Sequence, residues 1–351
     1  SIIVTIIDAT PPQIIAPADV TAETIGPTAT VILGTPTVTD NVDSSPIVSN
    51  NAPSAFPIGT TTVIWTAEDF SGNTATAAQQ VSITESSDDS FGVRKIYNTK
   101  VGGPGWIMNT DNVLNDPLFG TIPASSSTCT VKTCTLLYKN SDGISWHAGR
   151  MNVSANEGIR LVVKSPEDAR WLNTEMTGYY KLTSSIYYPQ EFVHVIRSGS
   201  PHAVTCEGYS YYAGLTYDGN IAKIQKALYH GGDGKGYTPT LYVRGITTPL
   251  EDRWIGLKTI TYNLNGDSGV KIEIWIDDLN DNNWREVYEQ IDTGWSSTGD
   301  PSVYGCLNLA TGLPRSQDDI ILWGGTEQQF RADNAEMDFK WLSIREIVPP
   351  A

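Results

Sequence analysis

Apolar and polar residues alternate with period two along much of this chain, and this alternation limits the fold more than any other feature. The pattern is clear at residues 158–164, 178–182 and 270–276. Successive side chains of a β-strand point to opposite faces, so a half-buried strand produces this spacing. No segment sustains the apolar spacing of an amphipathic helix. The sequence therefore predicts an all-β protein.

The composition changes near residue 90 and indicates two domains. Residues 1–89 contain ten acidic side chains and no Lys or Arg. All sixteen tyrosines and nine of the ten tryptophans lie beyond residue 90. A polar, acidic linker at residues 86–90 joins a short module at 9–85 to a longer one at 91–348. The total length also agrees with two or three domains.

The net charge of −16 excludes functions that need a basic surface. Binding of nucleic acid requires a footprint of Lys and Arg, so nucleic acid is not a predicted partner. No run of about 18 apolar residues is present, and we predict no membrane span. Because the chain starts with neither an initiator methionine nor a signal peptide, we expect a mature secreted protein or an excised fragment.

Five motifs within residues 9–85 resemble the hyalin repeat, an immunoglobulin-like β-sandwich found in tandem arrays on extracellular proteins. They are Thr10-Pro11-Pro12-Gln13-Ile14, Ala18-Asp19-Val20-Thr21, Thr39-Asp40-Asn41-Val42-Asp43, Phe56-Pro57-Ile58-Gly59-Thr60-Thr61-Thr62-Val63 and Asp69-Phe70-Ser71-Gly72-Asn73-Thr74-Ala75. The resemblance implies an immunoglobulin-like fold and an extracellular or cell-surface location.

Residues 1–8 lie outside that repeat and look like the closing strand of a preceding one. Both faces of the segment are apolar, as shown by Ile2, Ile3, Val4, Ile6 and Ile7. An unpaired strand offers its backbone donors and acceptors to another sheet edge, and strand addition is a known mode of association. We predict strand donation to a copy of the chain or a neighbouring module, with folding back onto its own domain as the alternative.

The longer module has the pattern of one sandwich or barrel, because about 255 residues contain short strands and glycine-rich turns. Residues 254–263, the strand around Trp275 and residues 339–347 resemble strands of a concanavalin A-like jelly roll. Laminin-G-type domains, legume lectins and several polysaccharide lyases share that fold. The resemblance implies that the last strand lies beside the first. It carries no diagnostic catalytic motif and so predicts fold more than activity.

Four cysteines, an even number, fit an oxidising compartment. Cys129 and Cys134 are close enough in sequence for a local bridge, which leaves Cys206 to pair with Cys306. Three pairings exist, and we expect this one. The spacings of Cys and His do not match a zinc site. Asn152 begins an N-glycosylation pattern that is consistent with secretion.

A loop rich in Asp and Asn is the strongest candidate for a metal site. Asp278, Asn280 and Asn282 stand at alternate positions, as ligands do in calcium loops. Since the flanking segments alternate as strands, Glu289 lies too far along the next strand to complete an EF-hand. The one cofactor that the pattern indicates is a structural Ca²⁺ bound by this loop. The alternative is a solvated Asn/Asp turn.

Aromatic residues and a few charged ones indicate a glycan-binding surface. Sugar rings pack on aromatic faces, and their hydroxyls need oriented hydrogen bonds. The candidate glycan-binding residues are Tyr180, Tyr188, Tyr209 and Tyr211. The alternative is that these rings fill the core of the sandwich, because aromatic residues favour strands. Tyr179 and Tyr180 are adjacent, so we expect at least one of them to be accessible to solvent.

A polysaccharide lyase is the alternative activity. Jelly-roll lyases that resemble alginate lyase use Arg-x-Glu, Gln-x-His and Tyr-Lys-x-Gly-x-Tyr strands, and this chain matches none of them fully. Proton abstraction needs a base beside a charge-neutralising group. The candidates are Glu175, His194, Arg197 and Tyr179.

The leading interpretation is a non-catalytic cell-surface protein that acts in adhesion or in a surface structure, including a filament joined by strand donation. The alternative is a polysaccharide-binding protein or a polysaccharide lyase in which the repeat is a spacer. Expected partners are copies of the chain, neighbouring modules or a polysaccharide.

Overall fold

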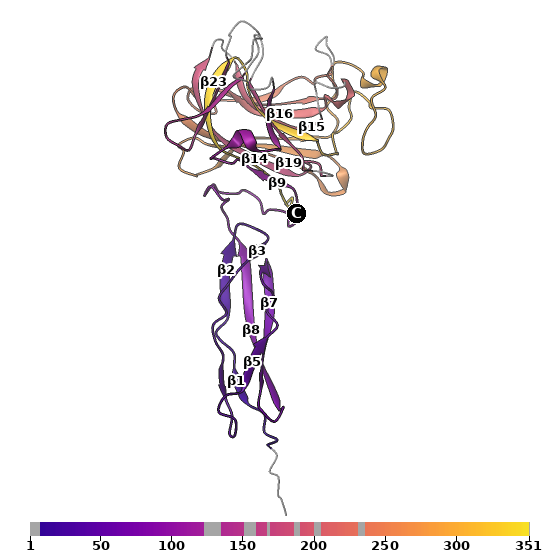
Figure 1. Cartoon of the computed structure of the whole chain (residues 1–351). Coiled ribbons are helices and arrows are strands. Elements are labelled where there is room, and N and C mark those ends of the chain that lie inside the picture. Colours follow the sequence, from indigo (N-terminus) through magenta and orange to yellow (C-terminus); the bar gives the residue numbers. More distant parts are fainter. Residues whose placement is uncertain are drawn as a thin grey trace, which may run out of the picture. The chain divides into compact units, whose positions relative to one another are not determined.

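The chain forms two compact units, residues 1–95 and 96–351 (Figure 1). The computed structural model describes residues 8–122, 135–150, 159–166, 169–185, 190–199, 205–230 and 236–350. Each unit has its own core and its own sheets. All the long elements are strands, so the all-β prediction is confirmed.

The described residues of the first unit form eight strands. They are β1 (Gln13–Ile15), β2 (Val20–Thr24), β3 (Thr28–Ala29), β4 (Thr37–Thr39), β5 (Ile47–Asn50), β6 (Phe56–Pro57), β7 (Gly59–Glu68) and β8 (Thr74–Glu85). Four of them form a sheet in the order β2-β8-β7-β5, while β1 pairs with β4 and β3 pairs with β6. Strand β2 runs parallel to β8, and the long hairpin β7-β8 is antiparallel.

The alternation along β7 and β8 builds the core of this unit. Val63, Trp65, Val81 and Ile83 are buried, and their neighbours along the strands are more exposed. Gln79 is fully buried because its amide is satisfied on both sides. It accepts a bond from the Trp65 indole at 3.0 Å and donates to two backbone carbonyls. These hydrogen bonds offset the cost of burying the amide and connect β8 to β7 and to the segments at Ala18 and Leu33.

The second unit is a sandwich of two sheets. The front sheet has the order β10-β13-β22-β15-β16-β17-β18, and the back sheet has the order β11-β12-β23-β14-β19-β20-β21, with β9 also paired to β23. The front strands are β10 (Phe119–Ile122), β13 (Ile159–Lys164), β15 (Glu191–Ser198), β16 (Ser210–Thr216), β17 (Ile221–Ala227), β18 (Leu241–Arg244) and β22 (Glu327–Ala332). The back strands are β9 (Gly105–Ile107), β11 (Thr135–Lys139), β12 (Trp146–Arg150), β14 (Thr174–Ser185), β19 (Trp254–Asn263), β20 (Val270–Asp277), β21 (Arg285–Asp292) and β23 (Ala335–Glu346).

The core of the second unit lies between these sheets. Tyr180 of the back sheet and Phe192 of the front sheet place their ring centroids 4.1 Å apart, and Phe330 packs edge-on against His194. Strand β9 pairs with β23, so an early strand lies beside the last one, as the jelly-roll resemblance implies. Figure 1 shows the front strands β15 and β16 and the back strands β14 and β19 as separate layers.

Short 3₁₀ helices are the other regular elements of the described residues. They are η1 (Val113–Asn115), η2 (Thr205–Glu207), η3 (Asn265–Asp267) and η4 (Pro301–Tyr304). Among the described residues, no helix has the length and apolar character needed to cross a membrane.

Candidate functional site

The outward side of the front sheet carries a pocket of about 140 Å³, here called the Tyr212 pocket. Strands β15, β16, β17 and β22 supply most of its lining. The lining residues are Glu191, Val193, Tyr212, Gly214, Lys223, Gln225, Tyr237 and Arg331. Residues 191–194 alternate along β15. Glu191 and Val193 point outward, whereas Phe192 and His194 face the core.

Two tyrosines form the aromatic part of the Tyr212 pocket. The ring centroids of Tyr212 and Tyr237 are 5.9 Å apart at an angle of 45°. His230 Nδ1 lies 3.2 Å from the Tyr237 hydroxyl. Burial and the neighbouring Tyr212 raise the pKa of Tyr237 above its ordinary value, although the charges of Arg331 and Arg160 oppose that shift. Tyr237 is therefore a neutral phenol at physiological pH.

Positive charge comes from the lining residues Arg331 and Lys223 and from Arg160, which lies next to the lining and is not part of it. Arg160 of β13 stands directly opposite Arg331 of β22. The Arg331 guanidinium binds both carboxylate oxygens of Asp333 at 2.7 Å and lies 5.8 Å from the centroid of the Tyr212 ring. Lys223 forms an ion pair with Glu191. Arg160 makes no ion pair with any residue that the structure describes. Burial, together with the charge of Arg331, lowers its pKa, although the charge of Asp333 opposes that shift.

A second pocket lies beside the disulfide and is lined in part by Arg170, Tyr209 and Arg315. Its arginines are already used by the fold. Arg315 donates to the carbonyls of Cys206, Leu228 and Leu307. Arg170 donates to the Tyr209 hydroxyl and the Gly324 carbonyl, both at 3.3 Å. This pocket therefore offers less unsatisfied charge to a ligand than the Tyr212 pocket.

His194 is enclosed between the two sheets and is not a surface base. Its Nε2 lies 2.8 Å from the Tyr180 hydroxyl, and its Nδ1 lies 2.9 Å from Thr259 Oγ1. Burial, with a smaller contribution from Lys258, lowers the pKa of His194 to about 3. The imidazole is neutral at physiological pH and has no contact with solvent.

The other three candidates for lyase chemistry also have structural partners. Arg197 is fully buried and donates to the carbonyls of Leu172 and Ile321. Glu175 binds Lys258 at 2.8 Å. Tyr179 donates to Asp277 at 2.5 Å. These contacts are separate from those of His194, so the prediction of one lyase site from Glu175, His194, Arg197 and Tyr179 is wrong.

The predicted glycan-binding tyrosines lie mainly in the core. Tyr180, Tyr209 and Tyr211 expose 1%, 2% and 0% of their surface. The expectation of an open aromatic face at Tyr180 and Tyr211 is therefore wrong, and Tyr209 contributes only to the wall of the second pocket. Tyr188 lies outside the described residues. The expectation that Tyr179 or Tyr180 faces solvent is also wrong, because the Trp284 and Trp341 rings cover Tyr179 from outside.

The loop proposed for calcium is a hairpin turn between β20 and β21, as expected from its flanking strands. However, Asp278 is occupied by cations of the protein. Its carboxylate lies 2.7 Å from Arg253 and 3.5 Å from Arg285. Burial raises the pKa of Asp278, but bonds from Thr247 and Arg253 hold it below its ordinary value. Asn280 and Asn282 adopt the left-handed conformation. This arrangement favours the polar-turn alternative, because the arginines already neutralise the only carboxylate of the proposed ligand set.

A group of three glutamates, Glu273, Glu286 and Glu289, lies close enough to hold a cation. Lys271 already pairs with Glu273 at 3.3 Å and with Glu289 at 2.6 Å. The Glu273 carboxylate also accepts bonds from Tyr97, Tyr262 and Trp275. Because Glu273 and Glu289 already have partners within the protein, the group is not a strong metal candidate.

The Cys206–Cys306 disulfide is present, so the expected long-range bridge is confirmed. Cys129, Cys134 and the acceptor Asn152 lie outside the described residues. Residues 1–7, which include Ile2, Ile3, Val4, Ile6 and Ile7, also lie outside them.

Residues 7–83 match the family model of the HYR domain, which confirms the hyalin repeat expected at residues 9–85. Comparison with curated protein sequences gives no match.

Several solved structures resemble the chain at low identity. A carbohydrate-binding module, CBM66 from Bacillus subtilis, is 12% identical, covers 66% of this chain and 97% of its own, and has a TM-score of 0.36. The Ca²⁺-bound exoplasmic/lumenal domain of VIP36 is 8% identical. The match covers 67% of this chain and 86% of the VIP36 domain, with a TM-score of 0.35. An endo-β-1,4-glucuronan lyase from the fungus Trichoderma reesei is 6% identical. The match covers 65% of this chain and 94% of the lyase, with a TM-score of 0.36. These likenesses are too distant to assign a function.

Proposed function

We propose that this chain, in which a HYR domain precedes a larger jelly-roll unit, is a non-catalytic extracellular protein that binds an acidic polysaccharide in the Tyr212 pocket. The HYR match and the Cys206–Cys306 bridge support the extracellular location, because disulfides persist in oxidising compartments. The observation that carries the glycan proposal is the position of Arg160 beside the pocket, opposite the lining residue Arg331 and without an ion pair among the described residues.

Like charges that face each other across a strand pair are destabilising. Asp333 neutralises Arg331, and the charge of Arg160 remains on the sheet surface. A sugar carboxylate bound here removes that repulsion and accepts two parallel bonds from a guanidinium, which is the geometry that arginine prefers. Tyr212 and Tyr237 supply rings on which the sugar can pack, and Gln225 supplies an amide for its hydroxyls. This set of groups favours a uronic acid over a neutral sugar.

Binding is favoured over elimination because Tyr237 is not activated as a base and Lys223, whose pKa is lowered by burial, is held in an ion pair by Glu191. A proton-abstracting tyrosine needs a pKa lowered toward the working pH. The pKa of Tyr237 is shifted in the opposite direction by burial and by Tyr212. The buried His194 lies on the other side of the sheet and cannot substitute.

Arg160→Ala is expected to weaken binding of uronic-acid oligosaccharides at least about tenfold, because a hydrogen-bonded charge contributes about 1.5–3 kcal/mol. The fold should be retained, since Arg160 has no ion-pair partner among the described residues. Arg244→Ala is the matched control, because Arg244 is an exposed arginine on edge strand β18 of the same sheet. Isothermal titration calorimetry of the full chain with acidic and matched neutral oligosaccharides measures the difference.

Three results would contradict the glycan proposal. They are no binding of any uronic-acid oligosaccharide, equal losses for Arg160→Ala and Arg244→Ala, or equal affinity for neutral and acidic sugars. Release of an unsaturated uronate, seen by its ultraviolet absorbance, would instead establish the lyase alternative.

A role in adhesion or in a filament joined by strand donation is a further part of the proposal. It rests on the apolar pattern of residues 1–8. Deletion of residues 1–7, which leaves Asp8 in place, is expected to give a folded monomer that no longer assembles, because the donated strand and its backbone bonds are removed. Analytical ultracentrifugation of both proteins over a range of concentrations is the measurement. A full-length chain that stays monomeric at high concentration would exclude this mode of assembly.

A further inference from the structure

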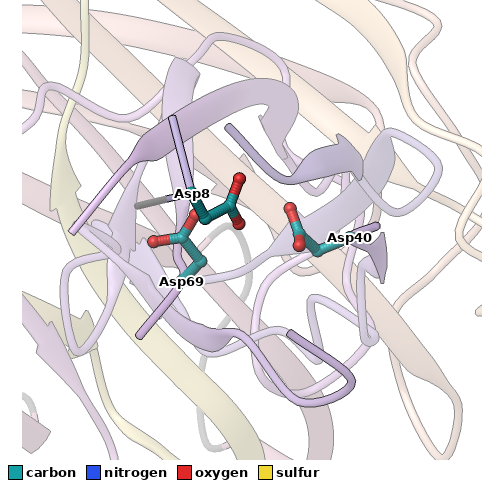
Figure 2. Close-up of side chains that lie close together, drawn as sticks. All are labelled: Asp8, Asp40 and Asp69. Atoms are coloured by element: carbon teal, nitrogen blue, oxygen red, sulfur yellow. The ribbon is translucent and has the colours of Figure 1, made fainter. Parts of the chain in front are cut away.

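Three aspartates from separate segments meet in the first unit. Asp8 precedes β1, Asp40 directly follows β4, and Asp69 directly follows β7. Figure 2 shows their carboxylates pointing toward one another. One oxygen atom from each lies within 4.8 Å of the others. Because β1 pairs with β4, the fold itself brings these segments together.

Each carboxylate is oriented by a bond from its own turn. Asp40 Oδ2 accepts bonds from the backbone amides of Val42 and Asp43, at 2.7 and 2.9 Å. Asp8 Oδ1 accepts from the Thr10 amide at 3.0 Å. These bonds use one oxygen of Asp40 and one of Asp8, and leave the second oxygen of each for another partner.

Asn73 connects two of the three segments. Its side-chain amide donates to Asp69 Oδ2 at 2.8 Å and to the backbone carbonyl of Asp8 at 3.1 Å. Asp69 Oδ1 accepts from the amides of Ser71 and Asn73. Burial raises the pKa of Asp69, but the bonds from Asn73, Ser71 and Gly72 hold it below its ordinary value. Asp69 therefore stays ionised at neutral pH.

Two oxygens in this group have no hydrogen-bond partner among the described residues. Asp8 Oδ2 and Asp40 Oδ1 are inaccessible to solvent and accept no hydrogen bond, and Asp69 exposes only 4% of its surface. Burying unpaired carboxylate oxygens is costly unless a positive charge compensates them. Residues 1–89 contain no Lys or Arg that could do so. The group thus differs from Asp278, which pairs with Arg253, and from the three glutamates, two of which pair with Lys271.

We propose that Asp8, Asp40 and Asp69 bind one Ca²⁺ ion. Ca²⁺ lies about 2.3–2.6 Å from its oxygen ligands, so ligands on opposite sides of the ion are about 4.6–5.2 Å apart. One oxygen from each carboxylate lies within 4.8 Å of the others, so a single ion of this size can contact all three. Water and backbone carbonyls complete the six to eight ligands that Ca²⁺ takes. The ion ties the segment that leads into β1 to the turns that follow β4 and β7, and so stiffens the start of the repeat.

Calorimetric titration of the chelator-treated full chain with CaCl₂ tests the proposal. One site per chain is expected. Its Kd should be about 10⁻³ M or lower, because extracellular calcium modules bind with a Kd of about 10⁻⁴ to 10⁻³ M. Asp40→Asn keeps an oxygen for the turn bonds but removes the charge, and it should weaken binding at least about tenfold. Asp8→Asn is a second variant in a segment outside the core, and circular dichroism checks that both remain folded.

Two control variants separate this site from a general effect of charge. Asp19→Asn makes the same charge change at an exposed position of the same unit, and Asp278→Asn makes it in the loop between β20 and β21. Both are expected to bind Ca²⁺ as the unchanged chain does. No Ca²⁺ binding by the unchanged chain, unaltered binding by folded Asp40→Asn and Asp8→Asn, or loss of binding in Asp278→Asn would overturn the proposal. Equal affinity for MgCl₂ would overturn the assignment to Ca²⁺.

Discussion

Replacement of Glu175 by alanine is expected to lower the free energy of unfolding of the second unit by about 3–5 kcal/mol, because it leaves two cations without their shared partner. Glu175 and Lys258 each expose 1% of their surface, and Arg345 exposes 9%. The carboxylate binds Lys258 at 2.8 Å and Arg345 at 2.5 Å. The backbone amide of Ile96 donates to it at 3.0 Å.

Guanidinium unfolding followed by tryptophan fluorescence measures this loss, since nine of the ten tryptophans lie in the second unit. Asp111→Ala is the matched control, because the Asp111 side chain is 94% exposed in its pair with Lys139. An exposed pair contributes about 0–1 kcal/mol. Similar losses for the two variants would show that the buried ion pairs of Glu175 do not stabilise the unit.

The same ion pairs predict a dependence on pH. Burial raises the pKa of Glu175, but the charges of Lys258 and Arg345 lower it by a larger amount. The pKa of Glu175 therefore lies below its ordinary value of 4.5. A depressed carboxyl pKa stabilises the fold above the unfolded pKa, and the contribution is lost as the pH falls through the folded value. The difference in stability between the unchanged chain and Glu175→Gln should therefore be constant above about pH 5 and shrink under more acidic conditions.

Removal of the Cys206–Cys306 bridge in the double variant Cys206→Ala/Cys306→Ala is expected to cost about 4–5 kcal/mol in the chain-entropy model. The bridged residues are 100 positions apart, so the bond removes much freedom from the unfolded chain. It joins η2 to the segment after η4, where Arg315 donates to the carbonyl of Cys206. Loss of the bridge should therefore also loosen the second pocket.

Denaturant unfolding of the double variant, with and without a reducing agent, isolates this effect. The reducing agent should destabilise the unchanged chain more than the double variant, and any loss that remains in the variant reports on Cys129 and Cys134. Mass spectrometry of unreduced digests identifies the linked peptides directly. A loss below about 1 kcal/mol in the variant would contradict the chain-entropy estimate.

Several features of the fold follow from local sequence. Period-two alternation predicts strands, and the strands β13, β14 and β20 are present where the alternation predicts them. The hyalin motifs identify the first unit because their turns and short strands are local patterns. Cys129 and Cys134 are close enough in sequence to be expected to pair with each other, which leaves Cys206 to pair with Cys306. The Cys206–Cys306 bond is confirmed.

The candidate sites could be predicted only in part. Asp40 and Asp69 are visible in the hyalin motifs, but their convergence with Asp8 depends on the pairing of β1 with β4. Likewise, Arg160 and Arg331 are far apart in sequence and become neighbours only through the register of β13 with β22. Sequence patterns identify strands more reliably than they identify which strands pair.

Alternation along the sequence determined that each strand has two faces, whereas the tertiary structure decided what covers each face. Tyr179 and Tyr180 point to opposite sides of β14, as adjacent residues must. Both are buried, because the front sheet covers Tyr180 while Trp284 and Trp341 cover Tyr179. Tyr212, in contrast, lies on the side of the front sheet that holds the pocket. The physical reason is that burial depends on residues brought close by folding, and no local pattern contains that information.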